Sequence, residues 1–320
     1  MPIRIVSTGG TIASTDDAGG DATPSLSGED LVAAVSGLKA VADVETEQFA
    51  NVPSPHLTVK QLWGLTERVR ELDADPDVDG VVVTHGTSTL EESAYFVDLC
   101  YDGATPVVFT GAMRNPSLTS PDGPGNVLAS VQVAVEDRAG EMGVLVTLAD
   151  RVHAAREATK THSTALDTFR APEFGPLAVV EEGRVTWRRR PVNPDPTFDP
   201  DPDALTDDVA ALWVTVDMPE RQIRAATDAA AVCLATLGTG GHPPSVIPAL
   251  RDLRAADVPL VATTRCPEGR LGRETYGFEG SHRTLRDLDT YFSDLNLQKT
   301  RVRTIVALGA DRLDDAFEQP

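Results

Sequence analysis

Short valine-rich runs alternate with longer amphipathic stretches along this chain, and the alternation restricts its fold more than any other feature. Brief apolar runs between turn residues are typical of buried strands, whereas the longer stretches have the spacing of helices. Strands that alternate with helices indicate βαβ units in a parallel sheet. We therefore expect strands over residues 3–7, 80–84, 106–110 and 143–147, and helices over residues 61–73, 91–100 and 125–137.

A proline-rich segment interrupts this pattern. It begins at residue 191 (PVNPDPTFDPDP), and its repeated prolines disfavour both helices and paired strands. The alternation then resumes, with strands expected over residues 210–216, 230–235 and 259–263 and helices over residues 246–255 and 298–308. We predict an α/β protein: a large N-terminal doubly wound sheet domain (residues 1–190), a linker (residues 191–208) and a smaller flavodoxin-like C-terminal domain (residues 209–320).

The charge balance argues against two classes of partner. The 320 residues include 49 acidic and 28 basic side chains, which gives a formal net charge of −21. Such a chain lacks the basic surface by which proteins bind nucleic acids or anionic membranes. Four of the basic residues are lysines and 24 are arginines. Acid excess with scarce lysine predicts a protein of a salt-adapted archaeon, because molar salt screens charge repulsion beyond ~3 Å. An ordinary acidic surface is the alternative.

The cysteines indicate a reducing compartment. Cys100, Cys233 and Cys266 lie far apart and form no C-x-x-C pair, so neither a disulfide framework nor a cysteine metal site is expected. The sequence has no apolar run near the ~20 residues of a membrane span and no signal-peptide pattern at its start. We expect a cytoplasmic protein.

The first candidate site loop follows the first expected strand. Residues 7–13 read STGGTIA, and ligands of parallel sheets bind at the carboxyl ends of strands, where Thr11 would present its hydroxyl. Gly9 and Gly10 permit a tight turn and a close approach to a ligand. We expect the polar segment 14–28 to form a mobile lid. A phosphate or dinucleotide turn is disfavoured, because the loop lacks G-x-G-x-x-G and a P-loop lysine.

Three further loops carry hydroxyl groups or a lysine. Residues 84–92 (THGTSTLEE) follow a strand and open a helix, whose N-terminus favours anions, although a capping box also explains them. Lys160, within residues 158–161 (ATKT), is one of four lysines, which favours a function over an ordinary solvated side chain. Ser54, within residues 51–54 (NVPS), is suited to bind a carboxylate or to form a simple turn.

Together these loops resemble the signatures of the L-asparaginase family of threonine amidohydrolases. The two threonine signatures of that family match T-G-G-T-I-A at residues 8–13 and H-G-T-S-T-L-E-E at residues 85–92. The similarity extends from about residue 3 to about residue 310. It includes TGAMR at residues 110–114, SPDGP at residues 120–124, TKT at residues 159–161 and LNLQK at residues 295–299.

The resemblance implies a catalytic role for three residues. Thr11 would be the hydroxyl that attacks the amide and forms the acyl-enzyme. Thr87 would be the second threonine, paired with Lys160, and would orient or activate the attacking group or water. Backbone N–H groups near both threonines would stabilise the oxyanion. The family needs no metal or organic cofactor, takes L-asparagine and in some cases L-glutamine as substrate, and assembles as homodimers or homotetramers.

The resemblance also implies substrate-binding residues, with three departures. Ser54 would bind the substrate α-carboxylate, and Gly86 and Ser88 would line the same site. Ser88 stands where the family usually has the aspartate that holds the substrate α-ammonium, so either Glu91 or Glu92 is a candidate replacement. The sequence also lacks the lid tyrosine of many members, and Gly241 replaces an asparagine. We expect a raised KM for L-asparagine or a preference for a related amide.

Two alternatives share this resemblance. The amidase subunit of a tRNA-dependent amidotransferase has the same catalytic core, but such subunits usually carry an additional N-terminal domain and act on RNA. A non-catalytic amino-acid-binding homologue would explain Ser88, but not the retention of both threonines and the lysine. His85 is expected to be structural.

Overall fold

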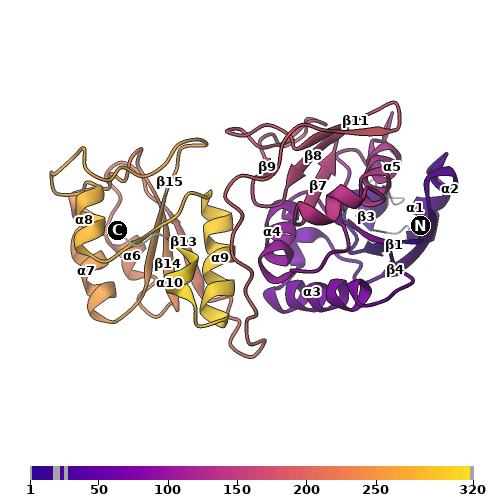
Figure 1. Ribbon diagram of the computed structural model, residues 1–320. Coiled ribbons are helices and arrows are strands. Elements are labelled where there is room, and N and C mark those ends of the chain that lie inside the picture. The colour runs from indigo at the N-terminus through magenta and orange to yellow at the C-terminus, as the bar shows by residue number, and fades with distance from the viewer. Residues whose placement is uncertain (1, 17–21, 25–27, 318–320) are drawn as a thin grey trace. The chain divides into compact units, whose positions relative to one another are not determined.

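The computed structural model describes residues 2–16, 22–24 and 28–317 and forms two compact units, Met1–Thr197 and Phe198–Pro320 (Figure 1). The division falls within residues 191–208, which contain no helix or strand. Part of the expected lid, residues 17–21 and 25–27, lies outside the described residues.

The N-terminal unit contains an eight-stranded sheet in the order β12-β11-β8-β7-β6-β5-β1-β4. The five strands from β7 to β4 run parallel, and β8, β11 and β12 continue the sheet with antiparallel pairing. The strands are β1 (Pro2–Ser7), β4 (Asp43–Gln48), β5 (Gly80–Thr84), β6 (Val107–Thr110), β7 (Leu145–Leu148), β8 (Arg151–Ala154), β11 (Ala178–Glu181) and β12 (Arg184–Trp187).

Helices pack on both faces of this sheet, which confirms the doubly wound α/β architecture. Alternate β5 residues face opposite sides: Val82 packs with α5, whereas Val81 and Val83 pack with α3 and α4. Helices α1 and α2 cover the α5 face. The helices are α1 (Gly28–Ala33), α2 (Leu38–Val41), α3 (Val59–Asp73), α4 (Leu90–Cys100) and α5 (Gly123–Ala134), with 3-10 turns η1 (Thr11–Ala13), η2 (Ser54–His56) and η3 (Asp137–Glu141).

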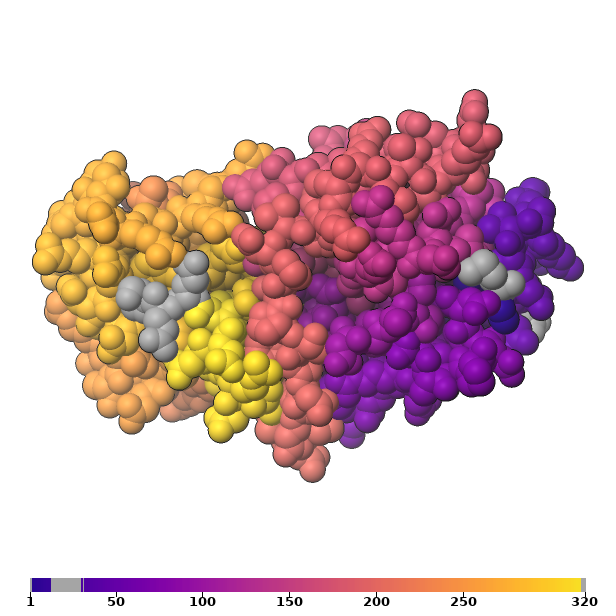
Figure 2. All heavy atoms as spheres, in the orientation of Figure 1, coloured from indigo at the N-terminus to yellow at the C-terminus, as the bar shows by residue number. Residues whose placement is uncertain are grey.

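Local sequence explains where α3 begins and which face it buries. Thr58 accepts a hydrogen bond from the backbone of Gln61, and the Gln61 side chain accepts one from the backbone of Thr58, which is a complete capping box. Leu65 and Val69 lie one turn apart in the core. The opposite, charged side of α3 forms part of the exposed surface of this unit (Figure 2).

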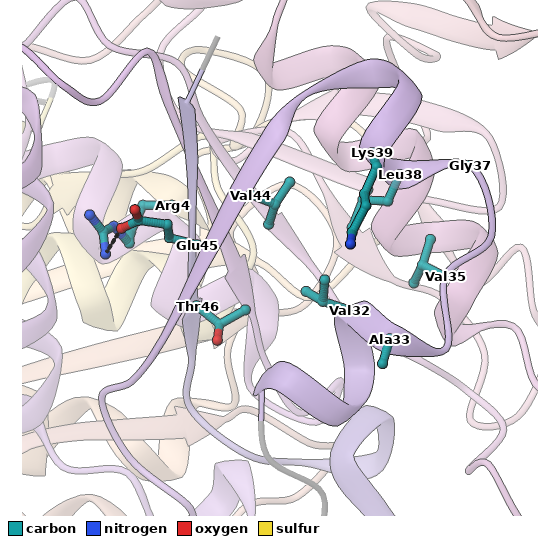
Figure 3. Close-up of a pocket in the computed structure, with 10 residues that line it drawn as sticks. All are labelled: Arg4, Val32, Ala33, Val35, Gly37, Leu38, Lys39, Val44, Glu45 and Thr46. Atoms are coloured by element: carbon teal, nitrogen blue, oxygen red, sulfur yellow. Dashed lines mark ion pairs between the residues drawn. The ribbon is translucent and has the colours of Figure 1, made fainter.

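A pocket lies beside the edge strand β4 (Figure 3). Val32 and Leu38 from the α1–α2 region and Val44 from β4 form its apolar lining, and Arg4 pairs with Glu45 at 2.8 Å at its border. Acidic residues on an edge strand disfavour pairing with another chain. The lining contains none of the residues that the sequence assigns to the site.

Two short hairpins complete the described part of the N-terminal unit. Strand β2 (Ser14–Asp16) pairs with β3 (Ala22–Pro24), and β9 (Thr159–Lys160) pairs with β10 (Phe169–Arg170), both in antiparallel register. The second hairpin places Lys160 opposite Phe169, which is fully buried.

The C-terminal unit contains a four-stranded parallel sheet in the order β13-β14-β15-β16. This smaller parallel sheet agrees with the expected second α/β domain. Its elements are β13 (Val209–Trp213), α6 (Arg221–Arg224), β14 (Ala231–Thr236), η4 (Pro244–Val246), α7 (Ile247–Ala255), β15 (Leu260–Thr264), α8 (His282–Asp287), β16 (Tyr291–Phe292), α9 (Leu297–Gly309) and α10 (Leu313–Ala316). Within the described residues, no helix combines the length and apolar character needed to cross a bilayer.

Candidate active site

Two of the motif loops meet because β1 and β5 are neighbouring parallel strands that end side by side. Ser7, the last residue of β1, lies opposite Thr84, the last residue of β5. Thr8 then donates from both its backbone N–H and its hydroxyl to the Thr84 carbonyl, each at 3.0 Å. The loop after β5 is held in turn by its other neighbour, since the His85 N–H donates to the Thr110 carbonyl at 2.8 Å. The strand order therefore brings the Thr11 and Thr87 loops together.

Backbone contact between Gly10 and Gly86 sets the spacing of these loops. Gly10 has a φ of +88°, and a Cβ there would lie 2.3 Å from the Gly86 Cα. A Cβ on Gly86 would lie 2.7 Å from the Ser54 Oγ, so three loops converge at this glycine. Thr89 fixes the third loop, because its hydroxyl donates to the Ser54 carbonyl at 3.0 Å. Neither Gly10 nor Gly86 has room for a side chain.

Thr11 begins the 3-10 turn η1 directly after Gly10. Its own side chain is half-buried, whereas that of Ile12 is 1% exposed. Ile12 packs against the start of α5, where a Cβ on Gly123 would lie 2.9 Å from the Ile12 Cγ1. The buried Ile12 thus anchors the turn while Thr11 remains accessible to a ligand.

Lys160 and Thr87, 73 residues apart in the sequence, form a direct hydrogen bond. The Lys160 Nζ donates to the Thr87 Oγ1 at 2.9 Å, and Thr87 is buried. Desolvation lowers the pKa of Lys160 below its ordinary value, and the nearby carboxylate of Glu91 partly opposes this change. A lysine with a lowered pKa is more readily deprotonated and can act as a base toward a hydroxyl group.

The structure distinguishes between Glu91 and Glu92, the two carboxylates that the sequence offered as replacements for the aspartate missing at Ser88. Ser88 itself is exposed, although it directly follows the buried Thr87. Glu91 is 6% exposed, whereas Glu92 is half-buried. Of the two glutamates, Glu91 is therefore the one that lies inside the protein beside Lys160.

His85 is held as a neutral, structural side chain. Its ring is fully buried against Phe109, with the ring centroids 6.1 Å apart. The Nδ1–H donates to the Gly86 carbonyl at 2.7 Å, because a carbonyl can only accept. Burial lowers the pKa of His85 to about 4. The ring is therefore uncharged at neutral pH and stiffens the backbone next to Thr87.

A second layer supports the loop after β6, and the sequence assigned no role to its two central residues. The Asp122 carboxylate accepts from the Met113 N–H at 3.0 Å, and Asn126 donates to Asp122 at 3.0 Å and to the Gly111 carbonyl at 2.9 Å. The Asn126 oxygen also accepts from the Ala149 N–H at 3.0 Å. Asp122 lies in the SPDGP motif of residues 120–124, and this motif is the only feature of the sequence that points to the residues supporting this loop.

The described residues contain no group of three or more histidine, cysteine or acidic side chains arranged to hold a metal ion. Thr11 and Thr87 offer hydroxyl groups, and Lys160 offers an amine with a lowered pKa.

Comparison with known proteins agrees with the motifs. Residues 2–193 match the family model described as "Asparaginase, N-terminal", and residues 208–319 match "Glutaminase/Asparaginase C-terminal domain". An L-asparaginase 2 of Bacillus subtilis is 44% identical over 184 residues, which span 56% of this chain and 49% of that relative. A probable L-asparaginase of Deinococcus radiodurans is 36% identical over 324 residues, which cover 98% of this chain and 95% of the relative.

A solved structure shows the same fold. The crystal structure of a probable cytoplasmic L-asparaginase from Campylobacter jejuni superimposes with a TM-score of 0.85 at 30% sequence identity, covering 96% of this chain and 94% of that one. Both family models, the long relative and the solved structure therefore agree, and the chain belongs to the asparaginase family of amidohydrolases.

Proposed function

We propose that this protein hydrolyses the side-chain amide of L-asparagine to L-aspartate and ammonia through an acyl-enzyme on Thr11. The observation that carries the proposal is the 2.9 Å hydrogen bond between Lys160 and Thr87, one loop away from Thr11. Amide hydrolysis by a threonine needs a hydroxyl nucleophile, a base and oxyanion donors. The site supplies the first two as side chains, and its convergent glycine loops supply backbone N–H groups.

The reaction divides into two steps. In the first, the Thr11 hydroxyl attacks the amide carbon and loses its proton, and the amide nitrogen takes up a proton and leaves as ammonia. In the second, water attacks the resulting ester, its proton passes to the base, and Thr11 regains its hydroxyl as aspartate leaves. The Thr87–Lys160 pair orients and deprotonates the attacking hydroxyl or water, and desolvation of the amine favours this role.

Recognition of the substrate involves Ser54, Gly86 and Ser88. The buried Ser54 side chain lies against Gly86, and we assign it the binding of the α-carboxylate. Ser88 offers no charge to the α-ammonium, which favours weaker binding of free asparagine than an aspartate would give. L-Glutamine is the second amide to test, because residues 208–319 match a glutaminase/asparaginase domain.

Ammonia release tests the proposal directly. Wild type, Thr11→Ala and Lys160→Met are assayed with L-asparagine and with L-glutamine in molar KCl. Lys39→Met is the matched control, because Lys39 is an exposed lysine in the lining of the β4 pocket. We expect the control to match wild type and both site variants to lose activity. Ligand binding by a folded wild type without turnover would instead indicate a binding protein. Turnover only with charged tRNA and a partner subunit would indicate an amidotransferase subunit.

The proposed setting is the cytoplasm of a salt-adapted organism, with the enzyme as a homodimer or homotetramer. The net charge of −21 and the presence of only four lysines support salt adaptation. Light scattering during size-exclusion chromatography measures the assembly. Circular dichroism and activity measured from zero to 3 M KCl test the salt requirement. A folded, fully active enzyme in salt-free buffer would overturn it.

A further inference from the structure

We propose that Glu91 is a positioning residue that holds the Lys160 amine against Thr87. This inference rests on the proposed function of the same site and assigns a role to a residue outside the three catalytic ones.

The burial of Glu91 is the first argument. Glu91 is the second residue of α4, which begins three residues after Thr87, and its side chain is 6% exposed. Ionised carboxylates are seldom buried this far without a compensating charge or hydrogen bonds. Lys160 supplies an opposite charge in this neighbourhood: its Nζ donates to the Oγ1 of Thr87, four residues before Glu91, at 2.9 Å, and the Glu91 carboxylate favours its charged form. Thr87 and Glu91 are buried and Lys160 is half-buried, so a hydroxyl, a carboxylate and an amine cluster where water has limited access.

The polar groups that flank Thr87 in the sequence carry no charge that could hold the amine. Ser88 is uncharged and exposed, and His85 is neutral because burial lowers its pKa to about 4. Among the described residues, Glu91 is the charged group whose field acts on Lys160. Three other acidic side chains form ion pairs with arginines: Asp167 with Arg170 at 2.6 Å, Asp195 with Arg156 at 3.1 Å, and Glu157 with Arg189.

Two opposing effects follow for the amine. Desolvation favours neutral Lys160, and the Glu91 carboxylate favours the charged form and orients it. Removal of the charge in Glu91→Gln therefore lowers the pKa of Lys160 further, and the Lys160 amine is no longer held in its orientation toward Thr87. We expect the Lys160 titration to move down by about one pH unit, the lower end of the effect of an adjacent charge. We also expect the acid limb of kcat/KM to move with it and the plateau to fall about tenfold.

The scarcity of lysine makes a direct test practical. Four lysines give four resonances in a protein labelled with 13C at lysine Cε, and Lys160→Met identifies the one that matters. Titration by NMR in constant KCl then reports on Lys160 whether or not the enzyme turns over. Glu92→Gln is the matched control, because it removes the adjacent, half-buried carboxylate of the same helical turn. Glu91→Asp keeps the charge with a shorter reach and serves if Glu91→Gln fails to fold.

The outcomes are distinct. A lowered Lys160 titration in Glu91→Gln, with an unchanged one in Glu92→Gln, supports the proposal. For Glu91→Asp, a nearly unchanged titration with a lowered kcat supports it as well. An unmoved Lys160 titration in folded Glu91→Gln, or an equal shift in Glu92→Gln, overturns it. Absence of ammonia release from wild type would refute the proposed function and leave the titration result to decide the role of Glu91.

Discussion

Replacement of Gly10 by alanine tests whether backbone contact between two loops places the nucleophile. Gly10 has a φ of +88°, and a Cβ there would lie 2.3 Å from the Gly86 Cα and 2.5 Å from its N. Both opposing atoms belong to the backbone, so no side-chain rotation can relieve the contact. The loops have to separate by about 1 Å to reach an ordinary van der Waals distance.

Two terms add to the expected cost. Placing a side chain in the left-handed region costs about 1–2 kcal/mol, and overpacking costs about 1–3 kcal/mol. We therefore expect Gly10→Ala to lose about 2–5 kcal/mol of unfolding free energy. The catalytic effect is also large, because a displacement of about 1 Å at a reacting group can cost about 100-fold in rate. Thr11 directly follows Gly10, so kcat/KM should fall by at least that factor.

Two other glycines separate these terms. Gly37 has a φ of +85° and open space around its position, so Gly37→Ala should show the conformational strain alone. Gly125 lies in α5 with open space and no positive φ, so Gly125→Ala should be neutral or stabilise by about 0.5–1 kcal/mol. Denaturant unfolding and ammonia release in molar KCl measure all three variants. A Gly10→Ala enzyme with kcat/KM within a factor of three of wild type would refute this account of the site.

Three further predictions concern other parts of the same site. Because burial lowers the pKa of His85 to about 4 from its ordinary 6.5, folding disfavours its protonation. The stability that neutral His85 provides is complete above pH 6.5 and is lost as the pH falls toward 4, by about 2 kcal/mol at pH 5. The stability difference between wild type and His85→Gln should shrink by that amount between pH 7.5 and pH 5 in denaturant unfolding. Ser88→Asp supplies a carboxylate for the α-ammonium and should lower KM for L-asparagine about tenfold in steady-state assays. Asn126→Ala removes three hydrogen bonds of the second layer and leaves buried partners unpaired, so it should lose about 2–4 kcal/mol in denaturant unfolding.

Each of these predictions has a contradicting result. A stability difference for His85→Gln that is constant from pH 7.5 to pH 5 would show that His85 binds a proton equally well in both states. An unchanged KM in Ser88→Asp would remove Ser88 from substrate recognition. A loss below 1 kcal/mol in Asn126→Ala would mean that water replaces its hydrogen bonds.

The sequence was sufficient for four of the five parallel strands of the large sheet, β1, β5, β6 and β7, but not for the edge strand β4. The valine-rich runs that became β1, β5 and β6 carry their own evidence of burial, because a strand covered on both faces must be apolar along its whole length. Strands β8, β11 and β12 were not anticipated. Each of them begins or ends on an exposed charged residue and lacks the fully buried run of β5 and β6, so local pattern does not distinguish them from loops.

Motif resemblance by itself determined the family and named Thr11, Thr87 and Lys160 as residues to examine. Tertiary structure decided which groups touch. The order of the strands, which depends on long-range pairing, brings Gly10 against Gly86 and Ser54 beneath it. A hairpin far along the chain carries Lys160 to Thr87. Tertiary structure also decides between Glu91 and Glu92. The two residues are equivalent in sequence, and only the rotation of α4 in the packed core buries Glu91 and leaves Glu92 near the surface.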